Sequence, residues 1–298
     1  MTMLGMGLDF STAADLREAV AATGYLADDE LATIAWLATR LHRPLLVEGE
    51  PGTGKTALAE ALASACGVPL IRLQCHEGID ASQALYDWDF PRQILHLRAI
   101  EAVDGTRSLE DAESGLFDER FLVARPILRA LREAPAVLLV DEIDRADDEF
   151  EAFLLEVLST WQVSIPEFGT VRATTPPLVV LTSNRTREVH DALKRRCLYQ
   201  WLEHPSLERE LAIVRSRAPE VSEELAGQVV RVIQGIRTDR ELLKPPGVAE
   251  TLDWARALHE LGVRDLDTES AAASLGVAVK YREDFDRVRA ALDRLMAR

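Results

Sequence analysis

Eight consecutive residues match the phosphate-binding loop pattern G-x-x-x-x-G-K-[ST]. They are Gly49, Glu50, Pro51, Gly52, Thr53, Gly54, Lys55 and Thr56. The glycines let backbone N–H groups turn toward phosphate oxygens, and a helix that begins at Lys55 adds the positive end of its dipole. We expect the Lys55 ammonium to reach the β and γ phosphates and the Thr56 hydroxyl to bind Mg²⁺. The pattern therefore predicts a site for a nucleoside triphosphate.

A pair of carboxylates follows the apolar run at residues 137–140. Asp141 and Glu142 end this predicted strand, which is the form of a Walker B element. We expect Asp141 to hold Mg²⁺, and Glu142 to orient and polarise the water that attacks the γ phosphate. Acidic residues also favour the first turn of a helix. We keep that simpler interpretation for the acids at residues 147–149.

A scaffold has to bring these residues together, and the hydrophobic pattern indicates its class. Short apolar runs bounded by turn residues predict five strands, with helical patterns between most of them. The runs are residues 45–48, 70–73, 137–140, 178–182 and 198–202. Such alternation is expected of a parallel sheet covered by helices on both faces. We predict an α/β fold with a five-stranded parallel sheet, preceded by two helices within residues 11–40.

The strand pattern stops near residue 205, and amphipathic helical patterns follow. Pro205 prevents continuation from the last strand, and Ser206 can cap a new helix. A chain of 298 residues also exceeds the roughly 250 residues at which single cores stop growing. We therefore predict an α/β nucleotide-binding domain over residues 1–204 and a small all-helical lid domain over residues 205–298.

Composition indicates which kind of partner the protein has and where in the cell it is found. The formal charge of −16 disfavours a general nucleic-acid binder, whose affinity would come from basic residues. A protein partner is expected instead. Three cysteines, Cys66, Cys75 and Cys197, have no disulfide or zinc spacing and are predicted to be buried thiols. The sequence has neither a secretion signal nor a membrane-spanning run, so we expect a cytoplasmic protein.

With two further motifs the chain resembles the AAA+ ATPases. Asn184 ends the strand at residues 178–182, and a basic run containing Arg195 and Arg196 precedes the last strand. The resemblance implies ATP hydrolysis, with Asn184 as the sensor 1 residue that holds the attacking water opposite Glu142. It also implies that Arg196, or else Arg195, is an arginine finger for the neighbouring subunit. The expected assembly is a homo-oligomeric ring, a hexamer.

Two insertions are similar to those of the MoxR-like ATPases and magnesium-chelatase subunits within that family. One is a predicted β-hairpin near residues 161–173, and the other is a helix insert near residues 77–98. The aromatic residues Tyr86, Trp88 and Phe90 of the insert fit a central pore and a buried core equally well. The sequence leaves both alternatives open.

The runs at residues 74–78, 86–88 and 181–186 look most like the CoxD type of MoxR-like ATPase. This resemblance implies a chaperone for metal-centre maturation of a molybdenum hydroxylase such as carbon monoxide dehydrogenase. Its implied partners are a von Willebrand factor A domain protein and the metalloenzyme client. The alternatives are a nucleic-acid motor, since restriction-type GTPases and helicase loaders share these motifs, and a nucleotide-sensing scaffold.

The family's sensor 2 arginine is absent at the best-aligned position, which is Ala249. Lys244 or Arg256 are the candidates to replace it. The preference between ATP and GTP also stays open, because the only base-reading candidate is the weak one at Gly24-Tyr25.

Overall fold

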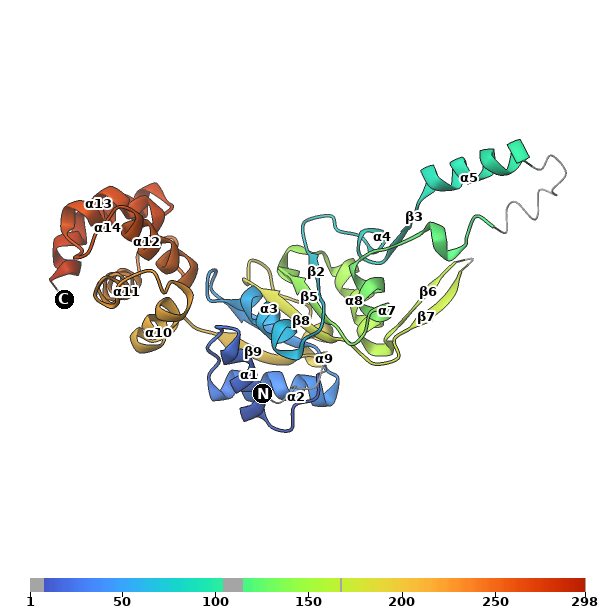
Figure 1. The fold of residues 1–298 in the computed structure, drawn as a ribbon, viewed down its shortest axis with the longest axis horizontal. Helices are drawn as coiled ribbons and strands as arrows, with labels where there is room; N and C mark the ends of the chain where they lie inside the picture. The colour runs from blue at the N-terminus through green and yellow to red at the C-terminus, as the bar shows by residue number, and fades with distance from the viewer. Residues whose placement is uncertain (1–7, 104–114, 167, 298) are drawn as a thin grey trace.

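The computed structural model describes residues 8–103, 115–166 and 168–297. At its centre is a five-stranded sheet with the order β2-β5-β8-β1-β9, in which every neighbouring pair is parallel (Figure 1). The strands are β1 (Leu45–Gly49), β2 (Leu70–Gln74), β5 (Val137–Asp141), β8 (Leu178–Ser183) and β9 (Leu198–Leu202). The predicted α/β fold and its five-stranded parallel sheet are confirmed.

Helices cover both faces of the sheet. Alternate residues of the central strands point to opposite faces, so that Leu45 and Val137 belong to one hydrophobic core while Leu46 and Leu138 belong to another. Burial on both faces explains why β1, β5 and β8 are apolar along almost their whole length. The first core contains α1 (Ala13–Ala22), α2 (Asp29–Leu41) and α3 (Lys55–Cys66). The second contains α7 (Pro126–Arg132), α8 (Asp148–Thr160) and α9 (Asp191–Arg196).

The helices that follow β9 have a core of their own, which is built around the fully buried Trp254. The Trp254 indole N–H donates to the Ser274 hydroxyl at 2.7 Å. The helices are α10 (Leu207–Arg217), α11 (Glu223–Arg237), α12 (Val248–Glu260), α13 (Thr268–Ser274) and α14 (Arg282–Met296), with the short η3 (Leu275–Val277). This core shares no buried residue with the two cores of the sheet. The division of the chain into domains at residue 204 stays a prediction.

The helix insert projects from the end of the molecule opposite α10 to α14 (Figure 1). It consists of α4 (Ala81–Ala84), β3 (Tyr86–Trp88) and α5 (Phe90–Val103), and it returns through η1 (Glu119–Phe121) and β4 (Leu122–Ala124). β3 pairs antiparallel with β4. Tyr86 and Trp88 pack against the second core of the sheet, whereas Phe90 is 59% exposed. Tyr86 and Trp88 therefore belong to the core, and the placement of Phe90 at a central pore stays a prediction.

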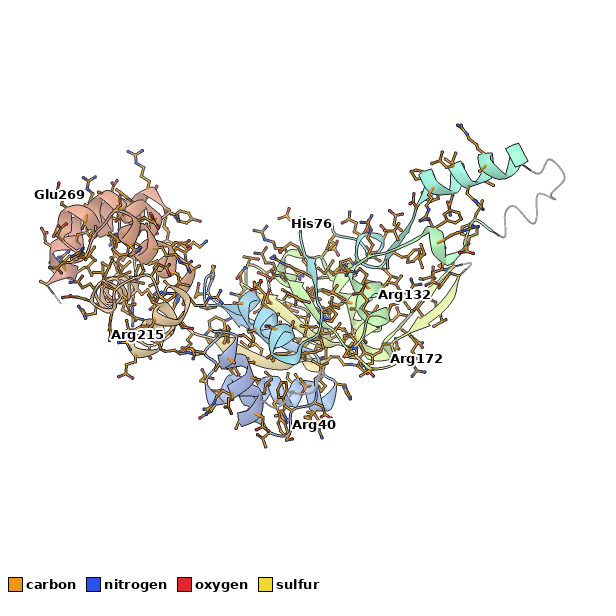
Figure 2. All side chains as sticks on the ribbon, viewed as in Figure 1. Arg40, His76, Arg132, Arg172, Arg215 and Glu269 are labelled. Carbon is orange, nitrogen blue, oxygen red and sulfur yellow. The ribbon has the colours of Figure 1, made fainter. Side chains whose placement is uncertain are left out.

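The predicted β-hairpin is also present, immediately before β8. β6 (Gln162–Ile165) pairs antiparallel with β7 (Gly169–Arg172), while residue 167 lies outside the described residues. The Arg132 guanidinium, at the end of α7, lies 5.5 Å from the centroid of the Phe168 ring at the turn of the hairpin (Figure 2). This contact ties the hairpin to the second core.

Two further observations bear on the composition-based predictions. Cys66, Cys75 and Cys197 are buried free thiols, as predicted. Across the described part of the chain, no helix combines the length and the apolar character needed to cross a bilayer.

Candidate active site

The phosphate loop lies between the end of β1 and the start of α3, at the carboxyl edge of the sheet. Gly52 and Gly54 have φ angles of +78° and +93°, which side chains with a Cβ rarely adopt. A Cβ on Gly54 would also lie 3.6 Å from the Tyr25 ring. The two glycines therefore allow the tight turn into α3, whose first N–H groups have no partner within the helix.

The Lys55 side chain is folded over the loop. Its ammonium donates hydrogen bonds to the carbonyl oxygens of Gly49 and Glu50, both at 2.8 Å. Burial lowers the pKa of Lys55 from its ordinary value, and the carboxylate of Asp144 is the strongest influence in the opposite direction. The ammonium is thus held at the centre of the loop by backbone oxygens.

Asp141 ends β5 and is the meeting point of three other elements. Its carboxylate accepts hydrogen bonds from Thr182 on β8 at 2.5 Å and from Arg72 on β2 at 2.5 Å. The Thr56 hydroxyl on α3 lies 3.2 and 3.3 Å from the two oxygens. Thr56 was predicted from the phosphate-loop pattern. Thr182 and Arg72 were not predicted, although Thr182 lies in a predicted strand two residues before Asn184.

The oxygen atoms of Thr56 and Asp141 suit the predicted Mg²⁺. Mg²⁺ prefers hard oxygen ligands, and a carboxylate with a hydroxyl beside it supplies them. The Asp141 side chain is only 4% exposed, so it is held in one orientation by its neighbours. The residues present at this point therefore fit a magnesium site formed by Thr56 and Asp141.

Glu142 follows Asp141 in a left-handed conformation, with φ of 56° and ψ of 51°. Its N–H donates to the Thr182 hydroxyl at 2.9 Å, so one threonine holds both acidic residues. The Glu142 carboxylate lies 3.2 Å from the Arg145 Nε and is 34% exposed. Because the chain turns here, the side chain of Glu142 reaches a cleft instead of continuing the strand.

That cleft has a volume of about 1230 Å³, and it lies between the carboxyl edge of the sheet and the helices that follow β9. Its lining brings together most of the residues predicted from the sequence, namely residues 51–56, Asp141, Glu142 and Asn184. Gly24, Tyr25 and Ala249 line it too. The volume exceeds the roughly 300–1,000 Å³ of typical ligand pockets, so the cleft has room for a nucleoside triphosphate.

Neither candidate for the missing sensor 2 arginine lines the cleft. Lys244 is exposed, and the Arg256 guanidinium bonds to Glu220 and to the Arg217 carbonyl. Arg209 and Arg217 of α10 line the cleft instead. Neither was predicted from the sequence, because helical periodicity does not indicate which arginine of an amphipathic helix turns toward the sheet.

Arg195 and Arg196 lie outside the cleft, at the exposed end of α9. In the described residues neither guanidinium forms an ion pair. Their backbone is anchored, because the Arg43 guanidinium donates to the carbonyls of Arg195, Arg196 and Cys197 at 2.9, 3.1 and 3.0 Å. Both side chains are therefore exposed, on a fixed backbone and apart from the cleft.

Two buried acidic residues, Asp144 and Glu151, fix the backbone of the segment that follows Asn184. Asp144 accepts hydrogen bonds from the N–H and the hydroxyl of Thr186, at 2.9 and 2.7 Å. Glu151 binds the Arg187 guanidinium and accepts from the His190 N–H at 2.7 Å. Asn184 therefore stands at the start of an anchored loop.

Comparison with known proteins identifies the family. Residues 44–197 match the AAA domain (dynein-related subfamily), and this segment contains the phosphate loop, Asp141, Glu142, Asn184 and the α9 arginines. The match covers more than half of the chain, which therefore belongs to this family. The protein is a AAA+ ATPase.

The individual relatives have low sequence identity to this chain or match only a part of it. An uncharacterized protein of Staphylococcus haemolyticus is 24% identical over 227 residues, covering 74% of this chain and 77% of the relative. Midasin from Giardia intestinalis is 35% identical over 96 residues, which cover 32% of this chain and 2% of midasin. The ATP-dependent zinc metalloprotease FtsH 1 of Sorangium cellulosum is 26% identical over 259 residues, or 81% of this chain and 35% of that protein. A mutant RuvB structure from Thermotoga maritima covers 92% of this chain and 73% of its own, at 14% identity and a TM-score of 0.48.

Proposed function

We propose that the cleft binds ATP with Mg²⁺ and that Glu142 and Asn184 act on the water that attacks the γ phosphate. One observation carries the proposal: Thr56 touches Asp141, and both line the same cleft as the phosphate loop, Glu142 and Asn184. Hydrolysis needs a phosphate cradle, a metal site and a water-activating base within reach of one another. This cleft contains a candidate for each.

The residues divide the work by their chemistry. The phosphate loop N–H groups and the Lys55 ammonium bind phosphate oxygens, which requires the ammonium to exchange its bonds to Gly49 and Glu50 for bonds to phosphate. Mg²⁺, held by Thr56 and Asp141, would neutralise negative charge on the phosphates. Glu142 accepts a proton from the water, and its partial exposure leaves it room to do so.

A ring of subunits completes the proposed site. Arg196, with Arg195 as the alternative, would reach the γ phosphate bound by the neighbouring subunit in a homo-oligomeric ring, taken as a hexamer. An arginine finger contributes about 10³ to 10⁵ in rate. Support comes from the exposed position of both arginines and from the anchoring of their backbone by Arg43.

At the finer level, we propose a MoxR-like chaperone that remodels a partner protein. The hairpin and the helix insert, at the positions typical of that group, support this assignment. The proposed client is a metalloenzyme, a molybdenum hydroxylase such as carbon monoxide dehydrogenase. The proposed partner that acts with this protein has a von Willebrand factor A domain. The net charge of −16 favours this proposal over a nucleic-acid motor.

The test uses Glu142→Gln, which keeps the shape of the side chain and removes the base. We expect this variant to bind ATP with Mg²⁺ at wild-type affinity while its turnover falls at least a hundredfold. Glu149→Gln is the matched control, since it makes the same charge change at an exposed position on α8. Equal turnover in Glu142→Gln and the control would contradict the assignment of the base.

The same variant tests the finer proposal. Because it should retain ATP, it should hold its partners, and these can be recovered from native cells by affinity purification. Recovery of a von Willebrand factor A domain protein together with a molybdenum hydroxylase would support the maturation role. Recovery of nucleic acid would support the motor instead.

A further inference from the structure

Arg72 contacts the predicted magnesium ligand from a part of the fold that the proposed reaction does not use. Its strand β2 is the edge strand beside β5, and Gln74 is the register partner of Asp141. The Arg72 guanidinium donates to the Asp141 Oδ2 at 2.5 Å and to the Gln74 Oε1 at 2.6 Å. Gln74 therefore steers the guanidinium toward the carboxylate.

Burial differs sharply across this ion pair. The Asp141 side chain is 4% exposed, whereas that of Arg72 is 52% exposed. The guanidinium thus covers a buried carboxylate from the solvent side, and the arginine has open space into which it can rotate. A buried carboxylate without a partner is costly, so this contact offsets part of the cost of burying the Asp141 side chain.

The contact also competes with a metal. Oδ1 of Asp141 already accepts from Thr182, and Thr56 lies near both oxygens, so Oδ2 is the oxygen that the guanidinium takes. A divalent cation bound to this carboxylate and a guanidinium on the same oxygen repel each other. The cation must therefore displace Arg72 or share the oxygen with it at an electrostatic cost.

We propose that Arg72 is a tethered counterion of Asp141 that sets how tightly the site binds its divalent metal. It is a positioning residue: it orients the Asp141 carboxylate until the metal arrives, and it leaves Oδ2 when the metal binds. The proposal rests on the proposed function, because it assumes that Asp141 is a metal ligand. The side chain at position 72 then determines the metal concentration at which the site is half occupied.

The first test is metal affinity. Mn²⁺ serves as the probe, and its binding in the presence of saturating ADP is followed by electron paramagnetic resonance. We expect Arg72→Gln to bind Mn²⁺ about three- to thirtyfold more tightly than the wild type, the range that spans a partly exposed ion pair and a charge-assisted hydrogen bond. Arg72→Lys, which keeps the charge, should stay near the wild type. Arg129→Gln is the control, because it removes an exposed arginine of α7 that pairs with Glu133.

The second test is thermal unfolding with EDTA and without nucleotide. Arg72→Gln should melt several degrees below the wild type there, and the difference should shrink with Mn²⁺ and ADP, since the cation then replaces the lost counterion. A purely structural arginine would lower both melting temperatures equally. Unchanged or weaker Mn²⁺ binding by Arg72→Gln would overturn the inference. If the wild type itself bound no Mn²⁺ with ADP, the proposed function would fail first, and the EDTA melts would still report on the ion pair.

Discussion

The carbonyl oxygen of Gly52, in the phosphate loop, accepts a hydrogen bond of 2.9 Å from the N–H of Val248, the first residue of α12. The backbones approach closely here, because a Cβ on Gly247 would lie 2.7 Å from the Gly52 Cα. The Glu250 carboxylate accepts from the Gly247 N–H at 2.9 Å and so fixes the start of α12. The C-terminal helices are thereby joined directly to the loop that is proposed to bind phosphate.

Gly247→Ala should separate α12 from the phosphate loop, since backbone atoms on the other side cannot move as a flexible side chain can. Overpacking of this kind costs about 1–3 kcal/mol. We expect a lower melting temperature and a several-fold weaker affinity for ATP, measured by calorimetry. Gly227→Ala is the control, because a Cβ there would meet only the end of the Arg231 side chain and alanine favours the helix. Wild-type affinity in Gly247→Ala would show that the contact does not matter for binding.

Thr182→Val should impair hydrolysis and stability together. The Thr182 hydroxyl donates to Asp141 and accepts from the Glu142 N–H, and valine can do neither. Leaving such buried groups unpaired costs about 1–3 kcal/mol. We expect urea denaturation to show that loss and steady-state assays to show at least a tenfold lower kcat. Thr182→Ser keeps the hydroxyl and should behave like the wild type; a similar loss in Thr182→Ser would assign the effect to packing.

Arg43→Ala should reduce ATP turnover without changing the affinity for ATP. Its guanidinium holds three carbonyls at the end of α9, where the proposed finger lies, and it is outside the cleft. We expect about a tenfold fall in turnover, smaller than the 10³ to 10⁵ that complete loss of a finger would cause. Arg40→Ala, at the end of α2 and paired with the exposed Asp9, is the matched control (Figure 2). A weaker ATP affinity in Arg43→Ala would instead indicate damage to the cleft itself.

His204, in the lining of the cleft, should make stability depend on pH. Burial, helped by Arg237, lowers the pKa of His204 below its ordinary 6.5, while Glu210, Glu50 and Glu250 act in the opposite direction. The unfolded chain therefore binds this proton more readily than the folded chain. Its contribution to stability is complete above pH 6.5 and is lost as the pH falls through 6.5 toward the folded pKa.

The measurement is the urea midpoint at pH 7.5 and at pH 5.5. His204→Gln should lose less stability than the wild type over this interval, because glutamine binds no proton. His76→Gln, which changes an exposed histidine outside the cleft lining, should keep the wild-type response (Figure 2). Equal losses in wild type and His204→Gln would assign the pH dependence to other groups.

The strands of the sheet and the phosphate loop could be predicted because each is encoded by a short, contiguous stretch of sequence. The buried strands are runs of apolar residues, and the phosphate loop is a contiguous pattern, so β1, β5 and the loop could all be placed from the sequence. Thr182, Arg72 and Arg43 were not identified as parts of the site. Each acts across at least 40 residues, through strand order and register, and periodicity specifies neither.

The arginines near the sensor 2 position also depend on contacts between distant parts of the chain, which could not be predicted. Ala249, the position that the family resemblance aligns with sensor 2, lines the cleft at the start of α12. The sequence did not identify Arg209 and Arg217 as the arginines that line the cleft, since that depends on how α10 packs against the first helices. There the Arg209 guanidinium donates to Asp28 at 2.6 Å and to the Leu26 carbonyl at 2.7 Å.

The carboxylate of Asp141 is surrounded by side chains from α3, β2 and β8, and more than a hundred residues of chain separate β8 from the other two elements. During synthesis, a nascent chain that ends after β5 already carries Asp141 but still lacks Thr182. The cleft itself is closed only when α12 has been made, at Val248 and beyond. A ligand that contacts both sides of this cleft therefore stabilises the completed assembly of sheet and helices more than it stabilises the partly made protein.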